Sequence, residues 1–298
     1  MNQKLWPLFL SLFLISCAPP EEPSDTDETN DSDTPVTDID PNEQINFPDS
    51  VLRACVEKLI YGKNPGDPIY TKDVANITEI HCNGVSDLTG MQYLQDLEFV
   101  ELYDSHFNSL VPLANLFSII ALHVEGGGVK NLSDINMLSN LVSVLYKDSD
   151  LEDISALAGK ENLTTANIYG NQVKSLAALA SLPSLEKIDA SDNPTLTTLG
   201  AQFTAPKLTE LNISNCGLTS LNELSGLPEL ASIDAGDNYI TDTAFIATLS
   251  KLSSLTLQGN CLEGDQLQTY VDWWNKEHPD FPTTYEQELS NQSLSQCQ

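Results

Sequence analysis

Two histidines and a glutamate are the residues whose spacing comes nearest to a catalytic site. Glu101 follows His81 by 20 residues, and His123 follows Glu101 by 22. Two imidazoles and one carboxylate can hold a zinc ion and leave a coordination position open, as a metal-dependent hydrolase requires. The sequence shows no residues that would orient these ligands or enclose them. We therefore predict no metal site and no catalytic residue.

Other catalytic signatures are missing from the sequence, and its charge is strongly one-sided. We find no phosphate-binding glycine loop, no nucleophile elbow and no paired-cysteine zinc motif, so we predict a protein that is not an enzyme and uses no cofactor. The chain has 13 Lys and Arg against 43 Asp and Glu, a net charge of −30. This balance disfavours nucleic acid, which needs clustered cations, and favours solubility or a basic partner surface.

Apolar residues recur with a long period over most of the chain. Steps of 22 residues separate the unit starts, except for 20 after the first and 23 after Leu185. Further apolar residues stand 3, 5, 10, 13, 16 and 19 positions after each start. A fixed period of this length is typical of stacked repeats, and about nine units are present. They start at Ile77, Leu97, Ile119, Leu141, Leu163, Leu185, Leu208, Leu230 and Leu252.

The pattern inside a unit predicts its shape. Positions 3 and 5 alternate with polar residues, which is typical of a short strand with one buried face. Later apolar positions step by about three, which suits a 3₁₀-like return. One unit cannot bury its apolar side alone, so we expect the units to stack and their strands to form one parallel sheet.

Position 8 of the unit, where the chain leaves the strand, often holds asparagine. A buried amide offers both donors and acceptors to backbone groups that have lost their ladder partners. Cys216 takes this position in one unit, and we predict a buried, structural thiol. Units with Ser105, Gly127 and Ser149 should have less well-tied turns. The asparagines are Asn171, Asn193, Asn238 and Asn260.

The spacing Leu163-x-x-Ala166-x-Ile168-x-x-Asn171-x-Val173-x-x-Leu176 resembles the leucine-rich repeat. The 22-residue length and segments such as 132–135 resemble the internalin-type subclass, and 47–60 resembles the N-terminal cap of that group. The resemblance implies an α/β repeat fold: a leucine-rich-repeat solenoid with a parallel sheet on its concave face. Its convex side would be 3₁₀ or irregular, with a helical cap at each end. The family binds many unrelated partners.

The first 17 residues have the pattern of an export signal. One lysine precedes an apolar run, Leu5–Ile15, too short to span a bilayer. The run ends in Leu14-Ile15-Ser16-Cys17, which resembles the lipobox of bacterial lipoproteins and implies lipidation of Cys17. Ala18 in place of aspartate implies the outer membrane. The alternative is a plain secretory signal with an incidental cysteine.

These features predict five segments. Residues 1–16 are a signal peptide, and 17–44 are the lipidated cysteine with a disordered tether carrying ten acidic residues and no Lys or Arg. Residues 45–76 form an N-terminal helical cap, 77–262 the repeats, and 263–298 a C-terminal cap.

The remaining cysteines lie near the two ends of the solenoid. Cys55 is on the apolar face of the cap helix and Cys82 points inward from the first strand, so a disulfide would join them; Cys261 and Cys297 bracket the C-terminal cap. Geometry decides both pairings. Aromatic residues of the C-terminal cap form a lid over the last repeat or, alternatively, an exposed binding site. The lid residues are Tyr270, Val271, Trp273 and Trp274.

Outward strand positions 2, 4 and 6 form three columns on the predicted concave face. Their N-terminal half combines aromatic and charged residues, as binding hot spots do, while the C-terminal half is small and polar. We predict the partner site in the N-terminal half, beside His81. Its residues are Phe99, Glu101, Tyr103, His123, Glu125, Leu145, Lys147 and Tyr169.

Together these observations favour a monomeric binding module held to the cell envelope by lipid alone, recognising a protein or glycan. An alternative is a structural or assembly role in the envelope through the convex side. A less favoured alternative is a metal-dependent hydrolase at His81 and His123.

Overall fold

The computed structural model describes residues 40–297, and this part forms one compact unit. The predicted signal peptide, Cys17 and the tether up to residue 39 lie outside the described residues. The folded unit begins slightly before the expected boundary at 45. Gln44 forms an antiparallel bridge with Tyr70, and the Thr71 hydroxyl donates to the Asp40 carbonyl.

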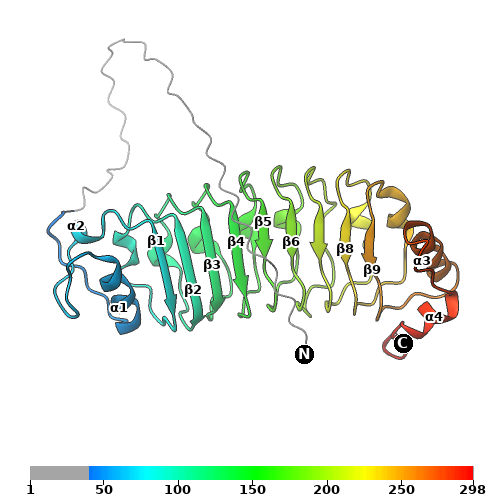
Figure 1. The fold of residues 1–298 in the computed structure, drawn as a ribbon, viewed down its shortest axis with the longest axis horizontal. Coiled ribbons are helices and arrows are strands. Elements are labelled where there is room, and N and C mark those ends of the chain that lie inside the picture. Colours follow the sequence, from blue (N-terminus) through cyan, green and yellow to red (C-terminus); the bar gives the residue numbers. More distant parts are fainter. Residues whose placement is uncertain (1–39, 298) are drawn as a thin grey trace, which may run out of the picture. The chain divides into compact units, whose positions relative to one another are not determined.

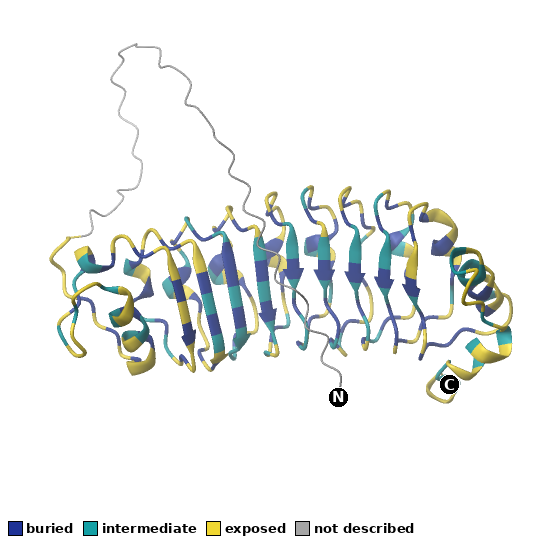
Figure 2. Ribbon diagram, in the orientation of Figure 1, coloured by how far each residue is buried: buried dark blue, intermediate teal, exposed yellow. Residues whose placement is uncertain are grey.

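Nine strands form a single parallel sheet in chain order, side by side between the two caps (Figure 1). The inward strand residues are buried, and the outward ones, apart from the buried Ala121, are more exposed (Figure 2). The strands are β1 Glu79–Asn83, β2 Phe99–Ser105, β3 Ala121–Gly126, β4 Ser143–Lys147, β5 Thr165–Asn167, β6 Lys187–Asp189, β7 Glu210–Asn212, β8 Ser232–Asp234 and β9 Ser254–Thr256.

Short 3₁₀ helices return the chain behind the sheet, as the three-residue apolar steps predict. The 23-residue unit has none between β6 and β7. Leu141, Leu163 and Leu185 are all fully buried in the core that the units share, as expected. The returns are η1 Met91–Tyr93, η2 Val111–Leu113, η3 Ser133–Ile135, η4 Ser155–Leu157, η5 Ala177–Leu179, η6 Asn222–Leu224 and η7 Ala244–Thr248.

The predicted asparagine ladder is present. Asn193, fully buried, donates from Nδ2 to the carbonyls of Ile168 and Ala190 at 3.0 Å and accepts the Val173 amide at 2.9 Å. Fewer side-chain bonds tie the turns of the second to fourth repeats, as expected: Ser149 Oγ bonds to two carbonyls, Ser105 Oγ to one, and Gly127 has no side chain. Strands β1–β4 run five to seven residues, against three for β5–β9.

Helices α1 Ser50–Leu59 and α2 Thr71–Val74 form the N-terminal cap. Asp49 caps α1 by accepting the Val51 and Leu52 amides at 2.8 and 2.9 Å. Its other oxygen accepts the Ser86 amide and hydroxyl, both at 2.7 Å. One carboxylate therefore joins the cap to the first repeat, and these bonds lower its pKa to about 2 against the opposing effect of burial.

The two expected disulfides, Cys55–Cys82 and Cys261–Cys297, are present, with Cα atoms 6.0 and 5.8 Å apart. Cys216 is the free cysteine of the described residues. It is buried, and burial raises its thiol pKa to about 11, so it is structural as predicted.

The C-terminal cap consists of α3 Gly264–Glu277, α4 Tyr285–Ser290 and η8 Leu294–Gln296. Tyr270 and Val271 are buried, and Trp273 and Trp274 pack against the core. Tyr270 and Val271 are thus buried as the lid interpretation predicts, while Trp273 and Trp274 remain partly exposed at its edge. Among the described residues, no helix is long and apolar enough to cross a membrane.

Candidate functional site on the outer face of the sheet

The strand register places the predicted partner-binding residues together. His81, Glu101, His123 and Leu145 are register partners on β1 to β4, and their side chains point away from the core. Tyr169 is the second residue after the end of β5. We call this set the aromatic–charged patch; it comprises His81, Phe99, Glu101, Tyr103, His123, Glu125, Leu145, Lys147 and Tyr169.

Glu101 lies between the two histidines. Its Oε2 is 2.8 Å from His81 Nδ1, and its Oε1 is 3.5 Å from His123 Nδ1. Burial alone would raise the pKa of Glu101. The hydrogen bond and charge of His81, the charge of His123 and a hydrogen bond from Tyr103 outweigh burial and lower it. The carboxylate is therefore held ionised in the centre of the patch.

His123 is the more buried of the two histidines, with its side chain 21% exposed against 52% for His81. Its Nε2 lies 3.0 Å from the Ser143 hydroxyl. Burial lowers the His123 pKa, although Glu101 opposes this effect, so the ring favours the neutral form. Within residues 40–297 no group of three or more His, Cys, Asp or Glu side chains is arranged to hold a metal, and the hydrolase alternative gains no support.

Glu125 and Lys147 form a second charged pair in the patch, 2.9 Å apart between Oε2 and Nζ. Both side chains are about one-third exposed. A pair this exposed contributes little to stability, but it fixes the positions of two long side chains on the binding surface.

The aromatic side chains supply the apolar area of the patch. Phe99 is 37% exposed at the start of β2, and Tyr103 and Tyr169 are half-buried. Burial and the charge of Glu101 raise the pKa of Tyr103, and a hydrogen bond to Asp192 raises that of Tyr169. Tyrosine rings with a polar tip are favoured at protein interfaces.

The C-terminal half of the same face carries small polar side chains in place of the aromatic and charged ones. Asp189 accepts the Ser191 amide and hydroxyl at 3.2 and 2.6 Å, and Asn212 accepts the amide and hydroxyl of Ser214 at 3.1 and 2.8 Å. These polar side chains bond within their own turns, so they offer fewer free groups to a partner than the patch does.

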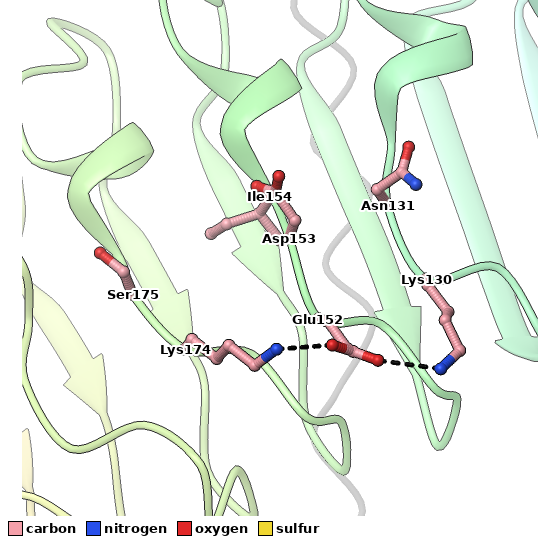
Figure 3. Close-up of a pocket in the computed structure, with 7 residues that line it drawn as sticks. All are labelled: Lys130, Asn131, Glu152, Asp153, Ile154, Lys174 and Ser175. Atoms are coloured by element: carbon pink, nitrogen blue, oxygen red, sulfur yellow. Dashed lines mark hydrogen bonds and ion pairs between the residues drawn. The ribbon is translucent and has the colours of Figure 1, made fainter.

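We did not predict a row of alternating charges that crosses three successive repeats. Lys130 and Lys174 approach the two oxygens of Glu152 at 3.0 and 2.6 Å, across a depression between repeats (Figure 3). Hydrogen bonds from both lysines lower the pKa of Glu152 to about 2. The sequence signal was available, because these residues follow one another at steps of 22 with alternating charge. One glutamate is thus shared between two lysines whose side chains are 68% and 63% exposed.

Similar solved structures are leucine-rich-repeat proteins. Internalin C2 of Listeria monocytogenes is 27% identical over 73% of this chain and 87% of that chain, with a TM-score of 0.56. The repeat domain of APL1B is 20% identical over 70% and 64%, with a TM-score of 0.56. That of FLRT2, in a complex with latrophilin 3 and Unc5D, is 15% identical over 67% and 67%, with a TM-score of 0.55.

No protein-family model matches the sequence, and a search of curated proteins found no match. The sheet topology and these structural relatives define a leucine-rich-repeat solenoid. The likeness to internalin C2 makes its fold internalin-like.

Proposed function

We propose that this protein is a non-enzymatic binding module that holds a protein partner on the aromatic–charged patch. The observation that carries the proposal is the contrast along one sheet face. Exposed and half-buried aromatic rings surround fixed charges on β1–β5, whereas the side chains of β6 and β7 bond within their own turns. Aromatic residues framed by charged groups are typical of binding hot spots.

The solved relatives support a binding role in general. The FLRT2 repeat domain is part of an octameric complex with latrophilin 3 and Unc5D. We carry over only the role of a protein-interaction module, since identity at that level shows the fold alone. A glycan is the alternative ligand, and a monomer with this face free is the form we expect to bind.

Affinity capture tests the patch. We expect Tyr103→Ala and Tyr169→Ala each to weaken capture of the partner by about tenfold or more, as loss of a hot-spot aromatic does, with an unchanged melting temperature. Tyr239→Ala is the matched control, because Tyr239 is 42% exposed outside the patch. Equal capture by all four proteins would contradict the proposal.

We further propose that the domain is tethered to the bacterial envelope through a lipidated Cys17, with the outer membrane as its location. The support is the sequence Leu14-Ile15-Ser16-Cys17 and the acidic segment after it. Cys17→Ser should abolish incorporation of labelled palmitate and release the protein from the membrane fraction. A labelled Cys17→Ser protein would contradict this anchor.

One observation favours the second function, assembly through the convex side. Large apolar side chains are exposed in repeats two and three: Val111 is 61% exposed, Phe117 51% and Met137 65%. Val111 begins η2 and Met137 follows η3, so both lie on the returns behind the sheet. Crosslinks from these returns to an envelope protein would favour the scaffold role.

A further inference from the structure

Strand β2 places Glu101 between two aromatic side chains of the aromatic–charged patch. Phe99, Glu101 and Tyr103 alternate with buried residues along β2, so all three lie on the outer face of the sheet. Phe99 is 37% exposed, and the Glu101 side chain is 30% exposed. A partner that packs on both rings therefore also covers the carboxylate between them.

A carboxylate that a partner covers needs a positive charge beside it, because burying an ionised group without a counter-charge is costly. In residues 40–297 the ion-pair partners of Glu101 are the two histidines, His81 and His123. Lys147, the lysine of the patch, is bonded to Glu125 instead, at 2.9 Å. The positive charge that this face of the chain can supply to Glu101 is therefore a proton on an imidazole ring.

His81 is the histidine placed to take up that proton. Its Nδ1 lies 2.8 Å from Glu101 Oε2, so Nδ1 carries a hydrogen that it donates to the carboxylate. In the neutral ring Nε2 is then the free acceptor, and a Glu79 oxygen lies 3.9 Å from it. The His81 side chain is 52% exposed, whereas burial lowers the pKa of His123. A proton on His81 Nε2 gives a cationic ring with a carboxylate on each side.

The groups around the two rings leave this role to the proton. On α1, which packs against β1, Arg53 lies 2.9 Å from Glu57, and Lys58 forms no ion pair within residues 40–297. The Ser143 hydroxyl of β4, which lies 3.0 Å from His123 Nε2, carries no charge. The titratable and charged groups that β1 to β4 contribute are Glu79, Glu101, Tyr103, Glu125 and Lys147.

We propose that partner binding at the aromatic–charged patch takes up one proton on His81, so that binding strengthens as the medium becomes more acidic. This inference rests on the proposed function and names how that same site is regulated. In the free protein water stabilises the half-buried Glu101 carboxylate. Once a partner excludes this water, a cationic ring paired with Glu101 costs less to bury than the carboxylate alone. Histidine is the side chain that ordinarily changes charge between about pH 5 and 8.

The affinity of the full chain for one defined probe, measured at about pH 7.5 and about pH 5.5, tests the coupling. The probe is the protein that a photo-reactive amino acid at position 99 traps in intact cells. We expect about tenfold tighter binding at the lower pH, the most that one imidazole of ordinary pKa, about 6.5, can add over this range. His81→Gln cannot take up the proton, so it should keep the weaker affinity at both pH values. His106→Gln is the matched control, because His106 is exposed directly after β2 but lies outside the patch, and it should keep the difference.

Glu101→Gln gives a second readout. A neutral amide needs no counter-charge and its oxygen still accepts the His81 N–H, so this variant should bind at the higher pH as tightly as the wild type does at the lower pH. Equal wild-type affinities at the two pH values, tighter binding at the higher pH, or a pH dependence that persists in His81→Gln would overturn the proposal. Loss of the pH dependence in His106→Gln would overturn it as well.

The failure of this inference and the failure of the proposed function give different results. If Tyr103→Ala weakens probe binding while pH leaves it unchanged, the proposed function stands and only the proton coupling falls. If position 99 traps no protein, the proposed function itself fails, and the proton coupling fails with it.

Discussion

Single buried polar residues decide how well the turns of this solenoid are tied. Asn193 bonds to four backbone groups of its own and neighbouring turns. Cys216 holds the same repeat position and makes only long sulfur contacts, 3.4 Å to the Ala190 carbonyl and 3.5 Å to that of Ser214. The two positions therefore form a matched pair for measuring the ladder.

We predict that Asn193→Ala lowers the free energy of unfolding by about 3 kcal/mol, because buried donors and acceptors lose their partners. Cys216→Ala should cost about 1 kcal/mol or less, since a thiol is a weak hydrogen-bonding group. Urea unfolding measures both. Equal losses would show that the side-chain amide has no special role.

Lys160 is a second unusual residue. It occupies position 19, which is leucine in most units. The side chain is buried, and its Nζ reaches the Ile135 and Asn136 carbonyls at 3.3 and 2.6 Å. Lys160→Leu should stabilise the fold by about 1 kcal/mol at pH 7, because a buried charge without a carboxylate is replaced by an apolar side chain.

The stability difference between Lys160→Leu and the wild type should depend on pH with a defined sign. Burial lowers the Lys160 pKa below 10.5, so between the folded pKa and 10.5 the unfolded chain binds more protons and wild-type stability rises with pH. The advantage of Lys160→Leu should shrink toward pH 10.5 in urea titrations. A constant advantage would contradict burial of a charged amine.

At the scale of elements, the sequence predicts most of the sheet. The 22-residue spacing gives the strands, their order and the register that aligns His81, Glu101 and His123. It does not predict the strand lengths, since β4 has five residues although Asn171 of the next turn donates to the Tyr146 carbonyl, and β7 has three although Cys216 replaces asparagine in its turn.

The N-terminal cap is joined to the sheet by the buried carboxylate of Asp49. Its pKa is about 2 against 3.8 for the free group. The unfolded chain therefore binds more protons, and about 2 kcal/mol of stability is lost as pH falls from about 4 to about 2.

Asp49→Asn should lower the stability at neutral pH to that of the wild type with a protonated Asp49. The reason is that an amide nitrogen would face the Ser86 donors in place of a carboxylate oxygen. The loss should appear as faster hydrogen exchange in α1. Asp96→Asn, at an exposed carboxylate, is the control and should exchange like wild type. If the stability of Asp49→Asn still fell between about pH 4 and about pH 2 as much as that of the wild type, this role of Asp49 would be contradicted.

At the scale of the whole chain, two features matter: the excess of acidic residues and the regular repeat. Acidic residues outnumber Lys and Arg by 43 to 13 in the whole chain, and most repeat lysines are paired with glutamates. The site was predictable as a set of columns, because register follows from the repeat. The position of Glu101 between the two histidines could not be predicted, because side-chain rotamers and burial are set only when the strands pack.

Site-specific photo-crosslinking on intact cells tests the central claim most directly. A photo-reactive amino acid replaces Phe99 in the patch, Ser232 in the same column of β8, or Met137 behind the sheet. We predict a discrete protein adduct from position 99 and none from 232 or 137. An adduct from 137 with none from 99 would contradict binding at the aromatic–charged patch.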